Sequence, residues 1–262
     1  MPIFYDQLNR AITLAGTPKR IISLVPSQTE LLFFMGMENA IVGITKFCIH
    51  PDTKVSMIAK IGGTKQLNLE AIHNLRPDLI IANKEENEQS QVEELMKHYP
   101  VWVSNINNLP DALDMIRRVG AMFDKKPLAE SLTFNITRQF ETIKISLIQI
   151  RVAYLIWRKP YMAAGQHTFI NNMLQICGFT NAIDAERYPV VTNDELIATA
   201  PEVLLLSSEP YPFTQKHINK FKAILPNTRV ILVNGEMFSW YGSRLVYAPG
   251  YFKGLIEKVN KN

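Results

Sequence analysis

Short runs of apolar and β-branched residues recur along the whole chain, and amphipathic stretches separate them. Each run is continuously hydrophobic instead of alternating between apolar and polar residues. Strands of that type are buried on both faces, as they are in parallel sheets covered by helices. The alternation therefore predicts an α/β fold with mainly parallel, Rossmann-like sheets. The runs cover residues 20–25, 40–45, 78–82, 101–104, 151–156, 203–207 and 229–233.

A weak internal repeat divides this pattern into two halves. Residues 70–85 and 194–209 align without gaps at an offset of 124 residues. In each copy a short helical stretch ends before a proline, Pro77 or Pro201, and a buried strand follows. The repeat predicts two similar lobes, and chance similarity between two α/β units is the alternative.

A single amphipathic stretch lies between the two halves. Pro127 suits the first helical position, and apolar residues then recur at spacings of three and four, which predicts a helix over residues 127–149. Such a helix would be about 35 Å long and would connect the lobes stiffly. The predicted domains are an N-terminal α/β lobe at 1–124, a connecting backbone helix at 125–150 and a C-terminal α/β lobe at 151–262.

Composition and charge argue against several classes of partner. With 28 basic and 24 acidic residues, the net charge of +4 gives no reason to expect a nucleic-acid or membrane partner. No apolar run of about 18 residues could span a bilayer, and the first twenty residues lack the apolar core of a signal peptide. The sequence as written therefore predicts a cytoplasmic protein that is not membrane-embedded, and a monomer is expected. Its two cysteines, Cys48 and Cys177, are predicted to be buried free thiols.

The common catalytic and metal-binding motifs are missing from the sequence. It contains no GxGxxG, GxxxxGK[ST], GxSxG or HExxH. No two of the five histidines stand at the i,i+4 spacing of a metal-binding helix, and neither a metal site nor an intrinsic cofactor is expected. His50 and His167 each lie in a turn after a strand-like run, one in each half, which makes them candidates for ligand contact.

The segment after the first strand run, at 26–34, has the pattern of a helix start. Ser27 followed by Glu30 fits a capping box, in which each side chain bonds a backbone amide at the helix end. This helix would begin at the carboxyl end of a parallel strand, which is the edge where open α/β folds bind ligands. A capping box that only caps the helix is the alternative.

Residues 234–244 place large aromatic side chains, two glycines and Arg244 directly after the last strand run. Rings held on short loops offer rigid contact area for a bulky ligand, and an arginine adds a fixed fork of donors. Packing into a core is the alternative for any one ring. Phe47 and Tyr188 are further rings that fall between the expected helices and strands. The predicted ligand-binding residues are Phe47, His50, His167, Tyr188, Phe238, Trp240, Tyr241 and Arg244.

Acidic residues follow the strand of each repeat copy. If both lobes presented these carboxylates in the same direction, they would form a two-pronged docking surface for a basic partner. Solvated surface charges are the alternative. The predicted docking residues are Glu85, Glu86, Glu88 and Glu209.

Four segments resemble, in order and spacing, the cobalamin-binding proteins of ABC importers. They are RIISLVPSQTELLFFMG at 20–36, IGGTKQLNLEAIHNLRPDLIIAN at 61–83, NNMLQICGFTNAI at 171–183 and MFSWYGSR at 237–244. Those proteins belong to the class III, helical-backbone substrate-binding proteins, which also carry ferric siderophores and haem. The resemblance implies two α/β lobes joined by one long helix, with a ligand held between them and little hinge motion.

The resemblance also implies a function and a location. It implies a non-catalytic protein that binds a cobalamin-like molecule, a ferric siderophore or haem, and that docks on a membrane permease through one glutamate per lobe. It implies a periplasmic or cell-surface location, unlike the sequence as written. Two alternatives stay open: an intracellular tetrapyrrole or corrinoid sensor or carrier, and a chelatase-like enzyme that would use His50 or His167 with Glu30.

Overall fold

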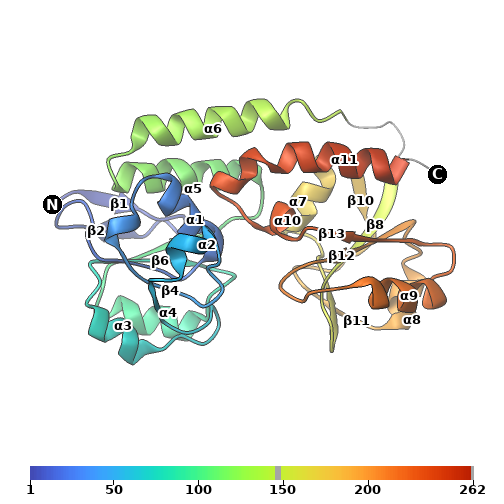
Figure 1. The fold of residues 1–262 in the computed structure, drawn as a ribbon, viewed down its shortest axis with the longest axis horizontal. Coiled ribbons are helices and arrows are strands. Elements are labelled where there is room, and N and C mark those ends of the chain that lie inside the picture. Colours follow the sequence, from blue (N-terminus) through green and yellow to red (C-terminus); the bar gives the residue numbers. More distant parts are fainter. Residues whose placement is uncertain (145–148, 261–262) are drawn as a thin grey trace. The chain divides into compact units, whose positions relative to one another are not determined.

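The computed structural model describes residues 1–144 and 149–260, which divide into two compact units (Figure 1). Unit 1 comprises residues 1–106, 110–136 and 241–244. Unit 2 comprises residues 107–109, 137–240 and 245–262. The chain therefore passes between the units several times, and each unit is assembled from segments that are distant in sequence.

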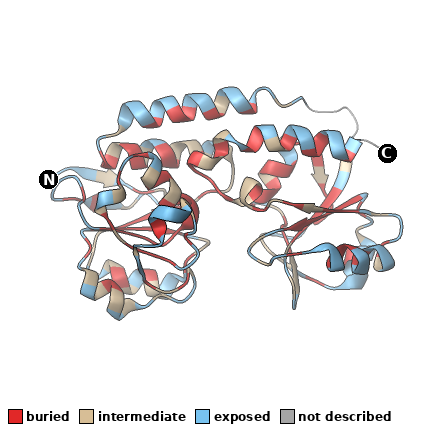
Figure 2. Ribbon diagram, viewed as in Figure 1, coloured by how far each residue is buried: buried red, intermediate tan, exposed pale blue. Residues whose placement is uncertain are grey.

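Unit 1 is built on a five-stranded, fully parallel sheet with the order β5-β4-β3-β6-β7. Its strands are almost entirely buried, except for the short edge strand β5, which explains their continuous apolar sequences (Figure 2). A separate antiparallel hairpin, β1 with β2, precedes the sheet. The elements are β1 (Ile3–Tyr5), β2 (Ala11–Thr13), β3 (Ile21–Ser23), α1 (Pro26–Phe34), η1 (Glu38–Ala40), β4 (Ile41–Ile44), α2 (Asp52–Val55), β5 (Ala59–Lys60), α3 (Leu69–Leu75), β6 (Leu79–Asn83), α4 (Gln89–Met96), β7 (Val101–Ser104) and α5 (Leu109–Met122).

Unit 2 contains a six-stranded sheet with the order β11-β9-β8-β12-β13, and β10 also pairs with β8. Strands β10, β12 and β13 continue the parallel arrangement, whereas β9 and β11 add an antiparallel edge. The elements are β8 (Ile150–Trp157), β9 (Tyr161–Ala163), α7 (Phe169–Ile176), β10 (Phe179–Asn181), β11 (Val190–Val191), α8 (Asn193–Ala198), β12 (Val203–Ser207), α9 (Gln215–Ile224), β13 (Arg229–Val233), α10 (Glu236–Ser239), η2 (Ser243–Val246) and α11 (Ala248–Asn260).

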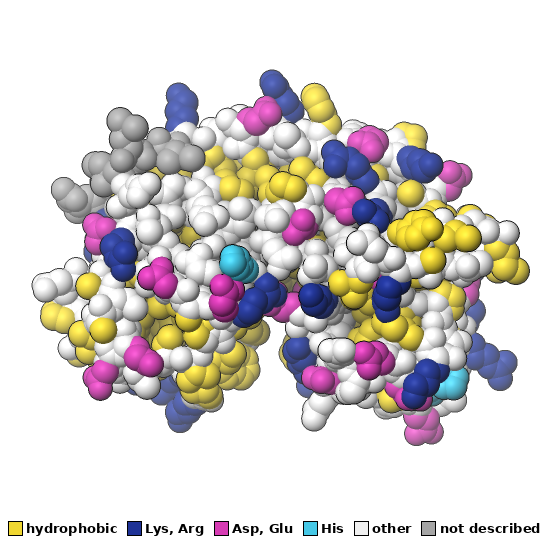
Figure 3. All heavy atoms as spheres, turned by 180° about the vertical axis from the view of Figure 1, so that it is seen from behind, with side chains coloured by type: hydrophobic (Ala, Val, Ile, Leu, Met, Phe, Trp, Pro, Cys, Tyr) yellow, Lys and Arg dark blue, Asp and Glu magenta, His cyan; other side chains and the backbone are white. Residues whose placement is uncertain are grey.

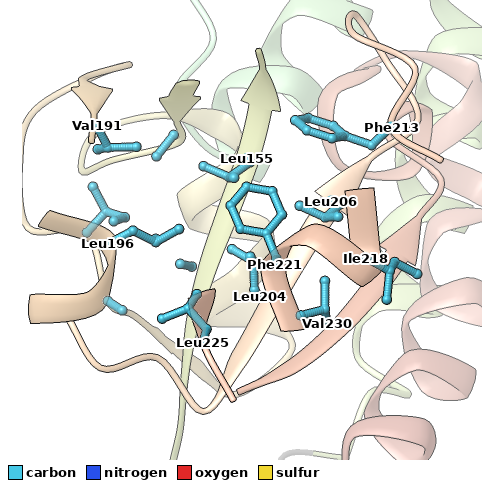
Figure 4. Close-up of a cluster of buried hydrophobic side chains, with 14 residues drawn as sticks. Leu155, Val191, Leu196, Leu204, Leu206, Phe213, Ile218, Phe221, Leu225 and Val230 are labelled. Atoms are coloured by element: carbon cyan, nitrogen blue, oxygen red, sulfur yellow. The ribbon is translucent and has the colours of Figure 1, made fainter. Parts of the chain in front are cut away.

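A hydrophobic cluster lies between α8, α9 and the sheet of unit 2 (Figure 4). Phe221 of α9 is fully buried among side chains of β8, β12 and β13, including Leu204 and Leu206. Its position explains the apolar stripe of α9, because Ile218, Phe221 and Leu225 recur at helical spacing. The sequence prediction of two α/β lobes with mainly parallel sheets is thus confirmed.

The internal repeat is visible in the backbone. Helix α3 and strand β6 of unit 1 correspond to α8 and β12 of unit 2 at the offset of 124 residues. Between helix and strand, Arg76 and Ala200 occupy equivalent positions, and both adopt left-handed backbone conformations with φ of 46° and 45°. Two non-glycine residues in a disfavoured conformation at the same place indicate a shared way of ending the helix before the proline.

The repeat extends to side-chain hydrogen bonds. The Asp78 carboxylate accepts hydrogen bonds from the backbone amides of Lys19 and Arg20, at 2.7 and 2.9 Å, and so ties β6 to the start of β3. In unit 2 the equivalent Glu202 carboxylate accepts one from the amide of Arg151 at 2.9 Å, at the start of β8. The acidic residue after each proline therefore fixes the register of two neighbouring parallel strands.

The predicted helix over 127–149 is shorter than expected. Helix α6 (Lys126–Phe140) has 15 residues, which makes it about 22 Å long, and it contributes to both units. Bonds from the amides of Thr142 and Ile143 to carbonyls three residues earlier tighten the chain at its end. The β-branched residues at 142 and 143 have low helix propensity, which disfavours continuation of the helix beyond this point. Part of the predicted helix, residues 145–148, lies outside the described residues.

Three further expectations concern the surface and the thiols. None of the helices that the structure describes is both long and apolar enough to cross a bilayer. On the face drawn in Figure 3, acidic and basic side chains are interspersed. Cys48 and Cys177 are both free thiols with 2% exposure, which confirms the prediction of buried cysteines.

Candidate functional site

The carboxyl edge of the unit 1 sheet carries a buried network of polar side chains. Asn83 and Ser104, the last residues of β6 and β7, are joined by a hydrogen bond from Asn83 Nδ2 to Ser104 Oγ at 2.9 Å. Gln28 of α1 donates to the same hydroxyl. Asn87 accepts a bond from the Asn83 amide at 2.8 Å and donates to the carbonyl of Leu24. These bonds fix the loops after β3, β6 and β7 relative to one another.

The start of α1 differs from the predicted capping box. Pro26 occupies the first helical turn with Val25 as the N-cap residue, so Ser27 lies inside the helix and caps nothing. The Glu30 side chain therefore takes no part in a capping box and bonds elsewhere. In the described part of the chain, the buried atoms Ser27 Oγ and Gln28 Oε1 have no hydrogen-bond partner.

Residues 241–244 lie on unit 1 and are anchored there by two side chains. Arg244 forms a two-pronged ion pair with Glu30, with Nε to Oε2 at 2.8 Å and Nη2 to Oε1 at 2.7 Å. Tyr241 donates a hydrogen bond from its hydroxyl to Glu86. Gly242, with φ of +128°, brings the backbone against Ser27, since an added Cβ would lie 3.1 Å from the Ser27 carbonyl oxygen. We refer to residues 241–244 as the return segment.

The return segment follows a stretch that is packed and not open. Phe238 is fully buried in unit 2, where its ring centre lies 4.8 Å from that of Phe252 and 5.1 Å from that of Tyr154. Trp240 and Tyr241 are 6% and 5% exposed. The expectation that Phe238 presents its ring to a ligand is therefore corrected, because that ring completes the core beneath α11. The bonding groups of Tyr241 and Arg244 are directed to Glu86 and Glu30.

In unit 1, the predicted ligand residues Phe47 and His50 are accessible. Phe47, in the turn after β4, is 50% exposed, and its ring lies against Gly63. A Cβ added to Gly63 would come within 3.1 Å of the ring edge, so this glycine lets the ring lie close to the backbone. Lys46 Nζ is 5.2 Å from the ring centre. The His50 side chain is 26% exposed, and its Nδ1 lies 3.6 Å from Asp52 Oδ1.

In unit 2, the predicted ligand residues His167 and Tyr188 lie on two loops that are bonded together. An isolated β-bridge joins Gln166 to Glu186, and the amide of Gln166 bonds the carbonyl of Ala185 at 2.8 Å. The side chain of His167 is 70% exposed, with Nδ1 3.0 Å from Glu186 Oε2. Tyr188, which lies two residues after Glu186, is half-buried. His167 and Tyr188 thus each follow directly on one residue of the bonded pair Gln166 and Arg187.

The predicted docking carboxylates are in different situations. Glu209 accepts a hydrogen bond from the Ser239 hydroxyl, and Glu86 accepts the one from Tyr241. Glu85 is half-buried, whereas Glu88 is exposed at the start of α4. Two of the four predicted docking residues therefore already contribute to local structure.

The sequence reasoning missed a second pair of acidic residues. Glu70 and Asp194 are equivalent in the repeat, both lie in the first turn of a helix, and both are exposed. A carboxylate in that position is favoured by the positive end of the helix dipole and needs no partner from the protein. The repeat alignment contained the signal, since it pairs residue 70 with residue 194.

The described residues offer little reaction chemistry. Among them, no group of three or more His, Cys, Asp or Glu side chains is arranged to hold a metal ion. Burial raises the pKa of both cysteine thiols, which disfavours the nucleophilic thiolate. The loops do present the exposed ring of Phe47 and the half-buried ring of Tyr188, which are suited to contact with a ligand.

The fold and these loops define a two-lobed α/β binding protein, and comparison with known proteins agrees. The periplasmic binding protein family matches residues 21–224. A vitamin B12-binding protein of Vibrio parahaemolyticus is 25% identical over 214 residues, covering 79% of this chain and 76% of that protein. The chain belongs to the periplasmic binding protein family. Membership confirms the prediction of a binding protein and decides against the chelatase-like enzyme.

Solved structures show the same fold. The periplasmic vitamin B12 binding protein BtuF of Vibrio cholerae has a TM-score of 0.75 and 20% identity, and the match covers 94% of this chain and 100% of that one. The periplasmic haem-binding protein RhuT from Roseiflexus sp. RS-1 has a TM-score of 0.77 and 20% identity, with coverages of 92% and 97%. At this identity the similarity establishes the fold, and two proteins named for different ligands share it.

Proposed function

We propose that this chain is the substrate-binding subunit of an ABC importer and captures a cobalamin-like molecule, or a related metal chelate such as haem or a ferric siderophore. The observation that carries the proposal is the exposed ring of Phe47, held against Gly63 at the carboxyl edge of a parallel sheet. Family membership and relatives named for vitamin B12 support it. A large flat or bulky ligand gains most from such a fixed ring.

The proposed contacts are assigned within each unit. In unit 1 they are Phe47 for ring contact and His50 for a polar contact. In unit 2 they are Tyr188 and His167, which lie on two loops that are bonded together. Tyr241 and Arg244 are proposed as supporting residues, because their bonds hold the return segment in place, and Trp240 is proposed as a third because it is 6% exposed directly before that segment. Phe238 is left out because it is fully buried.

Docking on a permease is proposed to use exposed carboxylates. Glu70 and Asp194 are the best supported, since they are equivalent in the two units and exposed in both. Glu88 is a further candidate in unit 1. Exposed charged groups steer and orient a partner of opposite sign, so a basic permease surface is the expected partner.

Ligand capture is tested by titrating the purified protein with cyanocobalamin, haemin and a ferric siderophore in turn. Absorption spectra and calorimetry should detect binding of one of them, and Phe47→Ala should weaken that binding about tenfold or more. Phe134→Ala is the matched control, because Phe134 is 69% exposed on α6 and lies outside the proposed contacts. Absence of binding to all three probes would refute the proposed ligand class.

Docking is tested separately by charge reversal in cells. Glu70→Lys with Asp194→Lys should reduce uptake of the bound ligand while binding by the purified protein is unchanged. Glu93→Lys with Glu257→Lys is the matched control, since these exposed residues change the net charge equally. If uptake is unaffected by the first pair although the protein binds ligand, the importer role fails and a sensor or carrier is the better description.

A further inference from the structure

One surface of unit 2 combines basic and aromatic side chains and has no part in the proposed ligand contacts. It is formed by the turn between β8 and β9 together with the start of α9 and the loop before it. We call it the basic aromatic surface. It consists of Trp157, Arg158, Lys159, Tyr161, Tyr211, Lys216 and Lys220.

Direct contacts hold the arginine and two rings of this surface together. Arg158 Nη1 donates to the Tyr211 hydroxyl at 3.3 Å and lies 3.4 Å from His217 Nε2. The ring of Trp157 meets that of Tyr211 edge to face, with centres 5.9 Å apart at 74°. Trp157 is nevertheless 39% exposed. A large amphipathic ring is therefore fixed at the surface beside a guanidinium group.

The lysine end of the surface is fixed as well. Lys220 Nζ donates to the Tyr161 hydroxyl at 2.7 Å and lies 5.1 Å from the centre of that ring. The ring of Tyr161 in turn contacts Phe221, at 5.2 Å between centres, and so rests on the core of unit 2. Lys216 precedes Lys220 by one helical turn, which places both on the same side of α9.

The charge of this surface is one-sided. The side chains of the basic aromatic surface include four of the chain's 28 basic residues and none of its 24 acidic ones. The basic charges also act on the buried His217. Burial lowers the pKa of its imidazole, and the nearby positive charges of Arg158, Lys216 and Lys220 lower it further. The net charge of +4 for the whole chain therefore conceals a strongly basic region.

We propose that the basic aromatic surface binds the headgroup region of a bilayer that contains anionic phospholipids. Lysine and arginine side chains near such a bilayer are attracted to it, and tryptophan and tyrosine settle at the boundary between headgroups and acyl chains. Trp157 beside Arg158 and Lys159 supplies both features at one turn. The contact is peripheral, so it is compatible with the lack of a spanning helix among the described residues.

Vesicle flotation provides the test, and it does not require the ligand of the proposed function. The protein should float with vesicles of phosphatidylcholine and phosphatidylglycerol, and should not float with phosphatidylcholine alone. Its tryptophan emission should shift to shorter wavelength on the anionic vesicles, because Trp157 is the most exposed of the three tryptophans. Added salt should release the protein, since the attraction is screened.

A triple variant locates the contact. Lys159→Gln, Lys216→Gln and Lys220→Gln together should weaken vesicle binding on the order of a hundredfold, since each lysine near an anionic bilayer contributes roughly fivefold. Lys126→Gln, Lys222→Gln and Lys253→Gln remove the same charge from exposed positions elsewhere. Lys222 is two residues beyond Lys220 and so points to another side of α9.

Three outcomes would overturn the proposal. The first is failure of the wild-type protein to bind anionic vesicles, including the case in which it binds only a soluble polyanion or an acidic protein. The second is an equal loss of vesicle binding in the control triple variant, which would reduce the effect to net charge. The third is vesicle binding without a change in tryptophan emission, which would place Trp157 away from the bilayer.

Discussion

Arg244 and Glu30 lie 214 residues apart in the sequence and form a two-pronged ion pair within unit 1. Their side chains are only 14% and 19% exposed, so water screens the pair less than it screens a surface pair. Together with the bond from Tyr241 to Glu86, this pair fixes the return segment on α1 and the loop after β6. The contact explains why an arginine stands at the end of an aromatic stretch.

Removing one partner of this ion pair should destabilise the protein. We expect Arg244→Lys or Glu30→Gln to lower the free energy of unfolding by about 1–3 kcal/mol, because the remaining group loses a bidentate partner in a partly buried place. Urea unfolding measures the change. Glu130→Gln is the control, since its pair with Arg117 is 63% and 44% exposed and should contribute less than about 0.5 kcal/mol. Equal effects in both variants would contradict the prediction.

Truncating Phe238 should affect stability before it affects binding. We expect Phe238→Ala to cost about 3–5 kcal/mol, because it removes a fully buried ring packed on Phe252 and Tyr154. Phe134→Ala removes a ring that is 69% exposed and should cost less than about 0.5 kcal/mol. A Phe238→Ala protein of normal stability that no longer binds ligand would restore Phe238 to the binding surface.

The backbone conformation at position 242 should require glycine, so that substitution by alanine destabilises the fold. Its φ is +128°, and an added Cβ would lie 3.1 Å from the Ser27 carbonyl oxygen, so Gly242→Ala should cost about 1–3 kcal/mol. Gly254→Ala is the control with the opposite sign, because Gly254 is an exposed helical glycine with nothing within 4 Å of an added Cβ. The free energy of unfolding of the Gly254→Ala variant should rise by about 0.5–1 kcal/mol. Thermal and urea unfolding of both variants compare the signs directly.

The protein should lose stability in alkaline solution. Burial raises the pKa of Cys48 and of Cys177 above the ordinary value of 9.0, so the folded chain keeps both thiol protons when the unfolded chain releases them. The thiols therefore stabilise the fold fully below pH 9.0, and this stabilisation falls by up to about 1.4 kcal/mol per pH unit for each thiol above it.

Urea unfolding about one pH unit below and about one above pH 9.0 measures how steeply the free energy of unfolding falls with pH. Cys48→Ala with Cys177→Ala should flatten the slope, even though the double variant is less stable at neutral pH. An unchanged slope in the double variant would assign the alkaline loss to other groups. The first such group to consider is Tyr154, because burial raises the pKa of its hydroxyl as well.

The strands and the repeat could be predicted because their signals are local. A parallel strand buried on both faces gives a continuous apolar run, and the repeat preserved a proline and an acidic residue at each strand start. The burial of Phe238 could not be predicted, since glycine and arginine neighbours occur in open loops and in packed turns alike. The partner of Glu30 was equally hidden, because it lies 214 residues away. Pro26, which takes the first turn of α1, was the overlooked local sign against the capping box.

The return segment has a consequence for building chimeras of this protein with its relatives. Residues 241–244 complete unit 1 although the chain on both sides of them belongs to unit 2. A chimera with a single crossover after α6 would pair one parent's Glu30 and Glu86 with another parent's residues at 241 and 244. Exchange of unit 2 therefore needs two further junctions, one on each side of residues 241–244, so that unit 1 keeps its own return segment.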